Sequence, residues 1–177
     1  VNHHWRRPLV CFVCLLLPTA LGLSTLDMKL VEAVADGNIE AAQEALNQGA
    51  NAAAQSDVGE TPLHIAGICS PFCPRNARMV DLLLENGADV NAAAHGPHSL
   101  SMRPLHWYVH PGYIQGIKAL IRAGADVNAV VFNESGDQIT ALDICEFIGE
   151  DRNAVGKLLK DAGAKRFNEL DLQEPDL

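Results

Sequence analysis

The chain has 177 residues, which suits one domain, and 22 acidic against 13 basic residues give it a net charge of −9. It lacks the lysine and arginine clusters that bind nucleic-acid phosphates or anionic lipid, so we expect neither nucleic acid nor a membrane surface as a partner. Aromatic residues make up only 5% of the chain. Much of the apolar content is alanine and leucine, which favours packed helices over sheet.

The first residues differ in composition from the rest and have the layout of a secretory signal peptide. Two arginines precede an uninterrupted apolar run, Leu9–Leu17. Small residues follow, so cleavage is expected after Gly22 or, as second choice, after Ala20. A membrane anchor is the alternative, but the run is shorter than the about 20 residues that cross a bilayer. We therefore expect residues 1–22 to be a signal peptide, and the mature protein to be periplasmic or secreted, with no membrane insertion after cleavage.

A short phrase recurs along the remaining chain. Gly-Ala-Asp-Val-Asn-Ala occurs at Gly87–Ala92 and again at Gly124–Ala129, and degenerate copies begin at Gly49 and Gly163. The copies begin at a nearly constant spacing along the chain, which indicates one structural unit that is copied and stacked. The glycine of each copy suits the left-handed conformation that ends a helix.

Two helices are expected in each unit. Thr61-Pro62 places a capping residue before a proline at the first helical position. Arg103-Pro104 repeats the pattern, and Thr140-Ala141 is a looser copy. A second helix follows, with apolar residues spaced i, i+3, i+4, as in Val80, Leu83 and Leu84. The fold class predicted from this pattern is all-α.

Thr61-Pro62-Leu63-His64-Ile65-Ala66, followed by Gly-Ala-Asp-Val-Asn, resembles the ankyrin repeat. The resemblance implies a solenoid of helix-turn-helix units with hairpin-like loops and a concave groove that binds other proteins. It also implies that His64 and His106 brace neighbouring loops, and that the chain has no catalytic activity and no cofactor. We expect a monomer. The domain is expected over 23–169, with repeats at 26–60, 61–101, 102–139 and 140–169, and an acidic disordered tail over 170–177.

The second unit departs from the repeat pattern between its helices. Residues 67–78 replace a tight turn and contain Cys69 and Cys73. In an exported protein these cysteines could form a disulfide, remain free thiols or act as a redox pair, and we favour the disulfide. Cys145 is expected to be a small buried core residue.

Longer loops also precede units three and four, at 94–101 and 130–137. Extra loop residues indicate either tolerated drift or a binding surface. We expect Tyr108 to turn outward into the groove, because it stands where the pattern has alanine. The hypothesis for function is an exported module that binds another protein, through loop tips and groove-side residues. These are Ser56, Asp57, His98, Phe132, Glu134 and Asp137 in the loops, and Trp107, Tyr108 and His110 in the groove.

The alternative is a metal- or thiol-dependent protein built on Cys69, Cys73 and the nearby histidines. His106 and His110 are four residues apart, which puts both rings on one helix face. However, no carboxylate or cysteine completes an obvious set of metal ligands, so we predict no metal site.

Overall fold

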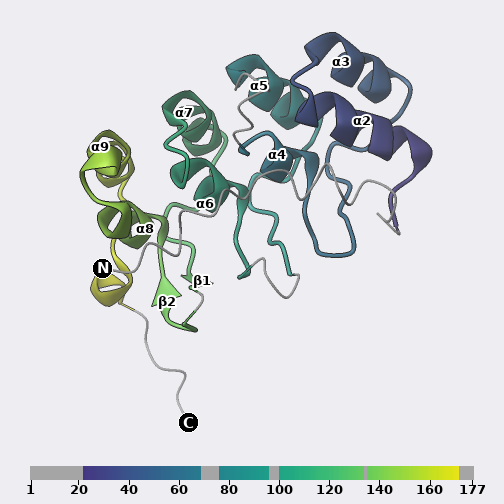
Figure 1. The fold of residues 1–177 in the computed structure, drawn as a ribbon. Helices are drawn as coiled ribbons and strands as arrows, with labels where there is room; N and C mark the ends of the chain where they lie inside the picture. The colour runs from purple at the N-terminus through teal and green to yellow at the C-terminus, as the bar shows by residue number, and fades with distance from the viewer. Residues whose placement is uncertain (1–21, 69–75, 96–99, 134, 172–177) are drawn as a thin grey trace.

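The computed structural model describes residues 22–68, 76–95, 100–133 and 135–171. Eight α-helices lie within these residues and follow one another as four antiparallel pairs. Helices α3, α5, α7 and α9 form one row, and α2, α4, α6 and α8 form a second row beside it (Figure 1). The helices are α2 (Thr25–Ala35), α3 (Ile39–Asn47), α4 (Pro62–Ile65), α5 (Ala77–Glu85), α6 (Pro104–Val109), α7 (Ile114–Arg122), α8 (Ala141–Ile148) and α9 (Asn153–Asp161).

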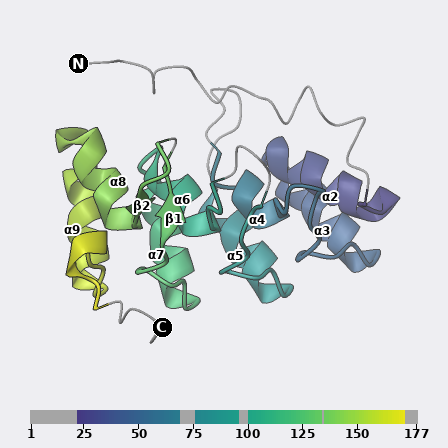
Figure 2. The ribbon, with the colours of Figure 1, turned by 90° about the horizontal axis from the view of Figure 1, so that it is seen from below.

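The loops that connect one pair to the next all project to the same side of the array. Seen from below, the pairs form a single row, with the loops toward the viewer (Figure 2). The loop before α8 contains a short antiparallel hairpin, β1 (Val131–Phe132) and β2 (Gln138–Ile139), in which Val131 pairs with Ile139. We call the face formed by α2, α4, α6, α8 and these loops the inner face. The helix-turn-helix solenoid predicted from the sequence is confirmed.

The helix starts and ends follow the expected local chemistry. The hydroxyl of Thr61 accepts a hydrogen bond from the His64 N–H, with Pro62 at the first helical position. Gly49, Gly87, Gly124 and Gly163 have φ values of 101°, 88°, 87° and 88°, so the glycine of each repeated phrase does take the left-handed conformation.

The asparagine of the repeated phrase joins the second pair to the third and the third to the fourth. The Asn91 amide donates to the Gly124 carbonyl at 3.2 Å and accepts from the Asp126 N–H at 2.9 Å. Asn128 makes the same two contacts one pair later, to the Gly163 carbonyl and the Lys165 N–H. These bonds hold successive turns in register, which gives the recurrence of Gly-Ala-Asp-Val-Asn a structural reason.

The third residue of each inner-row helix also links two segments. His64 accepts from the Thr61 N–H through Nδ1, and its Nε2 lies 3.3 Å from the Met102 carbonyl oxygen. His106 repeats this arrangement with the Arg103 N–H and the Ala129 carbonyl oxygen. The expectation that both rings brace neighbouring loops is confirmed. In the first and last helix pairs an aspartate links the segments in place of histidine. Asp27 accepts from the Asn51 N–H at 2.7 Å, and Asp143 accepts from the Phe167 N–H at 2.9 Å.

The outward orientation expected for Tyr108 is wrong. Its side chain is fully buried, and its hydroxyl donates to the Leu63 carbonyl oxygen at 3.0 Å. Space for the ring exists because two glycines face it: a Cβ added to Gly67 or Gly116 would overlap ring carbons of Tyr108. Tyr113 stacks on the same ring, with centroids 5.5 Å apart. The large Tyr108 ring therefore fills the space left by the two glycines and packs the second helix pair against the third.

Cys145 is buried in α8, which confirms the expected core position, and burial raises the pKa of its thiol to about 11. Among the described residues, no helix has the length and apolar content needed to cross a membrane. Cys69, Cys73 and most of the acidic tail lie outside the described residues, so the disulfide and the disordered end stay predictions.

Gly116→Ala and Gly156→Ala make a matched test of the Tyr108 packing. Both glycines are inside helices, where alanine is favoured by up to about 1 kcal/mol. A Cβ at Gly156 would make only ordinary contacts, the nearest at 3.7 Å. We expect Gly156→Ala to raise the free energy of unfolding and Gly116→Ala to lower it by about 1–3 kcal/mol, because the new methyl overlaps the rings of Tyr108 and Tyr113. Urea denaturation measures both. Equal stabilisation by the two variants would contradict the packing described.

Candidate functional site

The candidate site is the inner face, and the loop tips form one part of it. Asp57 is exposed at the turn before α4, while the half-buried Ser56 closes that turn: its hydroxyl accepts from the Glu60 N–H at 3.2 Å. The loop lies against its neighbour, because the His95 N–H donates to the Val58 carbonyl at 2.8 Å. Gly59 has φ 75°, and a Cβ there would overlap the His95 ring. The two loops are therefore packed together rather than independent.

The loop before α8 is built around one asparagine. The side-chain carbonyl oxygen of Asn133 accepts from the Ser135 and Asp137 N–H groups, and its amide donates to the Asp137 carboxylate at 2.9 Å. Asp137 is exposed, and Phe132 on β1 keeps 43% of its surface accessible to solvent. The Phe132 N–H donates to the Leu100 carbonyl at 3.2 Å, so this loop is also joined to the one before it.

The groove-side residues on α6 take three different environments. Trp107 is half-buried, with its ring edge-on to the His64 ring at a centroid distance of 5.3 Å. Tyr108, as described, belongs to the core and offers nothing to a partner. His110 is exposed at the end of the helix, and local desolvation followed by the nearby Arg152 guanidinium lowers its pKa.

Arg152 holds the end of α6 against the last helix pair. Its guanidinium donates to the Val109 carbonyl at 3.2 Å and to the His110 carbonyl at 3.0 and 2.6 Å. Those carbonyls are at a helix C-terminus, where unsatisfied acceptors and the negative end of the helix dipole favour a cation. The arginine thus fixes the position of His110 on the inner face.

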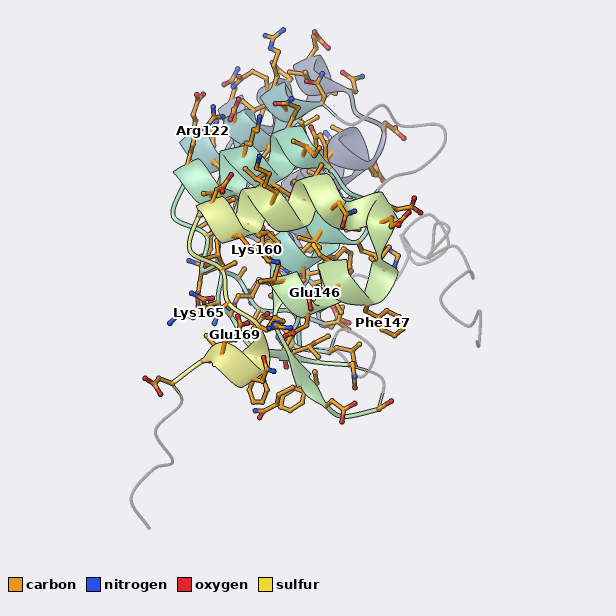
Figure 3. The ribbon with its side chains drawn as sticks, turned by 90° about the vertical axis from the view of Figure 1, so that its left-hand side faces the viewer. Arg122, Glu146, Phe147, Lys160, Lys165 and Glu169 are labelled. Atoms are coloured by element: carbon orange, nitrogen blue, oxygen red, sulfur yellow. The ribbon has the colours of Figure 1, made fainter. Side chains whose placement is uncertain are left out.

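The structure adds exposed residues that the sequence did not single out. Phe147, near the end of α8, has 72% of its surface exposed (Figure 3). With Phe132 it is one of two large apolar side chains exposed within the described residues. Phe147 lies two positions after the buried Cys145. At the end of a helix, the spacing of apolar residues in the sequence does not distinguish a core position from an exposed one.

Two of the proposed contact residues, His98 and Glu134, lie outside the described residues. Ser56, Asp57, Trp107, His110, Phe132 and Asp137 lie on inner-row helices or on the loops beside them. The structure therefore places the described candidates, apart from Tyr108, on elements of the same face, although they are spread over two loops and one helix.

The histidines give the alternative of a metal site little support. Both ring nitrogens of His64 and of His106 are engaged with backbone groups, so neither has a lone pair to offer a metal. Within the part of the chain that the structure describes, no group of three or more His, Cys, Asp or Glu residues is placed to hold a metal ion.

Comparison with known proteins finds the same repeat architecture. Residues 30–131 match the family model described as ankyrin repeats, in three copies. A protein of Bos taurus named cyclin-dependent kinase 4 inhibitor B is 34% identical over 98 residues, which cover 55% of this chain and 68% of the relative. The protein of the same name from Mus musculus is 32% identical over 99 residues, covering 56% of this chain and 69% of the relative. The last helix pair lies beyond the residues that the family model matches.

The bracing histidines predict a loss of stability in mild acid. Burial lowers the pKa of both His64 and His106 to about 4. In each ring Nδ1 accepts a backbone N–H, so protonation would set two donors against each other. The unfolded chain, with ordinary histidine pKa values near 6.5, takes up these protons first, so stability present above about pH 6.5 is lost as the pH falls toward 4.

We expect the melting temperature to fall by roughly 5 °C or more between pH 7 and pH 4.5. The variant His64→Gln/His106→Gln should start lower and fall less over this range, because glutamine keeps a donor but does not titrate. Differential scanning calorimetry across the range measures both. Parallel pH profiles for the two proteins would show that other groups cause the loss.

Proposed function

The chain belongs to the ankyrin repeat family, and we propose that it is an exported, non-catalytic module that binds another protein along its inner face. Ankyrin repeats mediate protein–protein interaction, so the class of partner follows from the family. The face, the residues that contact the partner and the location outside the cytosol are the proposed parts.

The observation that carries the choice of face is the position of exposed apolar surface. Phe132 lies on the loop before α8, and Phe147 lies on α8 itself. Exposed aromatic side chains are common anchors at protein interfaces, where they fill pockets of the partner. Trp107 and His110 on the neighbouring helix α6 extend the same surface. Among the described residues, the outer-row helices expose charged residues such as Lys118 and Arg122 and no large apolar side chain.

The way the scaffold is built also supports binding by a fixed surface. Each loop is held to the next by a backbone hydrogen bond, between Val58 and His95 and between Leu100 and Phe132. A surface that is already ordered loses little conformational entropy when it binds. We therefore expect the inner face to bind its partner with small changes in its own backbone.

Export rests on the sequence of residues 1–22, which lie largely outside the described residues. The proposal predicts that the protein recovered from its host lies outside the cytosol and begins at Leu23 or Leu21. N-terminal sequencing of the mature protein tests this. A protein that retains Arg6 and Arg7 and stays in the cytosol would contradict export.

A second candidate comes from the relatives, whose name describes inhibition of a cyclin-dependent kinase. It would make a protein kinase the partner. A kinase activity assay with the purified protein separates the two. Inhibition at stoichiometric concentration would favour this candidate, whereas unchanged kinase activity is what export and a different partner predict.

The inner face is tested by Phe132→Ala against Lys118→Ala. Immobilised protein captures partners from the exported fraction of the host, and quantitative mass spectrometry compares the variants. Removing a central aromatic anchor typically costs about 2 kcal/mol of binding, so Phe132→Ala should reduce capture at least tenfold with nearly unchanged melting temperature. Lys118→Ala changes an exposed residue of α7 and should capture as much as the parent. If the α7 variant loses the partner and the Phe132 variant keeps it, the outer row is the binding surface.

A further inference from the structure

One position recurs in all four helix pairs and differs in chemistry in one of them. It is the residue directly before the N-cap of each inner-row helix, and its occupants are Leu23, Glu60, Met102 and Ile139. All four residues are half-buried. Three are apolar, as suits a partly covered position between a loop and a helix, and the fourth is an acid.

The direction of the Glu60 side chain follows from its neighbours. Thr61 is fully buried and bonded to His64, and Gly59 is buried against His95. Thr61 has extended backbone angles of −111° and 164°, and successive side chains of an extended chain point to opposite sides. The Glu60 side chain therefore leaves the backbone away from Thr61 and its helix contacts, on a loop that forms part of the inner face.

Glu60 and Met102 stand on loops that lie side by side. The Val58 carbonyl accepts from the His95 N–H at 2.8 Å, and the Ala94 N–H donates to the Met102 carbonyl at 3.0 Å. These bonds run through the same pair of loops in which the two residues are found. The acid is thus next to an apolar residue at the equivalent position of the following pair.

The ionised form of Glu60 is unfavourable in the protein alone. Its backbone N–H and carbonyl bond to Ser56, but its carboxylate makes no hydrogen bond or ion pair within the described residues. Burial raises its pKa. A partly desolvated carboxylate without a partner lowers stability, and an apolar residue as in the other three pairs would not. Residues that reduce stability in this way are often kept for function.

We propose that Glu60 binds a lysine or arginine side chain of the partner protein, and that Met102 and Ile139 contact apolar residues of the same partner segment. The opposite charge satisfies the carboxylate, and the chain's own acidic balance favours a basic segment. This rests on the proposed binding at the inner face and adds the chemistry of the partner.

The repeat geometry sets the spacing of such a segment. Neighbouring helices in the array lie about 10 Å apart, which an extended peptide covers in about three residues at 3.3 Å each. A lysine or arginine at Glu60 would therefore be accompanied by a large apolar residue three positions away, at Met102, and by another three positions further, at Ile139.

Selection from a phage library of random twelve-residue peptides tests the proposal directly on the purified protein. Clones selected on the parent protein should be enriched in lysine or arginine with a large apolar residue three positions away. Their binding should fall at least tenfold on Glu60→Gln and on Glu60→Met. Glu85→Gln changes an exposed acid on α5 and should bind as the parent does.

Thermal melting adds a readout that separates a binding role from a structural one. Glu60→Gln and Glu60→Met should raise the melting temperature at pH 7 by about 1–3 °C while they weaken peptide binding. Lower stability in both variants would mean that the acid supports the fold, and would overturn the proposal.

The outcomes also separate this proposal from the function on which it rests. Peptides that bind the parent and Glu60→Gln equally but lose affinity on Phe132→Ala would leave the inner face as the binding surface and exclude the cation site. Selection of peptides without basic residues would also exclude the cation site and leave the inner face as the binding surface. Selection of no peptide, or of peptides that the outer-row variant Lys118→Ala alone abolishes, would contradict both.

Discussion

The array depends on one side chain per helix pair, the third residue of the inner-row helix. In each pair it accepts the N–H of its own N-cap and reaches the backbone of a later loop. The bond closes a helix start and fixes a loop at the same time. Each such loop also packs on its neighbour, so buried contacts set the position of the loops. The loop tips are not needed for this and remain available for binding.

The chemistry of that side chain differs between the middle and the ends of the array. His64 and His106, in the middle pairs, are fully buried and reach carbonyl oxygens, for which a neutral ring with hydrogen on Nε2 is suited. Asp27 and Asp143, at the ends, reach N–H groups instead. An aspartate suits the end pairs because the position is only half-buried there, whereas a charged group would be costly at the fully buried position of the middle pairs.

The sequence predicted the parts of the structure that depend on local chemistry. Thr61-Pro62 and the four glycines determine helix starts and ends through their own backbone preferences, and a fixed period makes the stacking visible without coordinates. Tyr108 was misjudged because its environment is made by Gly67 and Gly116, which belong to other segments. A glycine in a sequence does not reveal which ring will occupy the space it leaves.

The candidate site was predicted in outline only, for a related reason. Loop tips such as Asp57 and Asp137 are recognisable as turns, and their exposure follows. Phe147 and Glu60 become informative only once it is known that one is largely exposed and the other half-buried without a partner. The irregular loops indicated one side of the molecule as the candidate site. The regular positions beside them give more specific information about the chemistry of that site.

Amide hydrogen exchange on the complex with a captured partner tests the central claim most directly, because it compares both rows of helices in one experiment. Binding at the inner face predicts slower exchange in the loops at 56–60 and 131–139 and at the end of α6. Exchange in α3, α5, α7 and α9 should be unchanged. Protection confined to those outer-row helices, with the loops exchanging as in the free protein, would contradict the account.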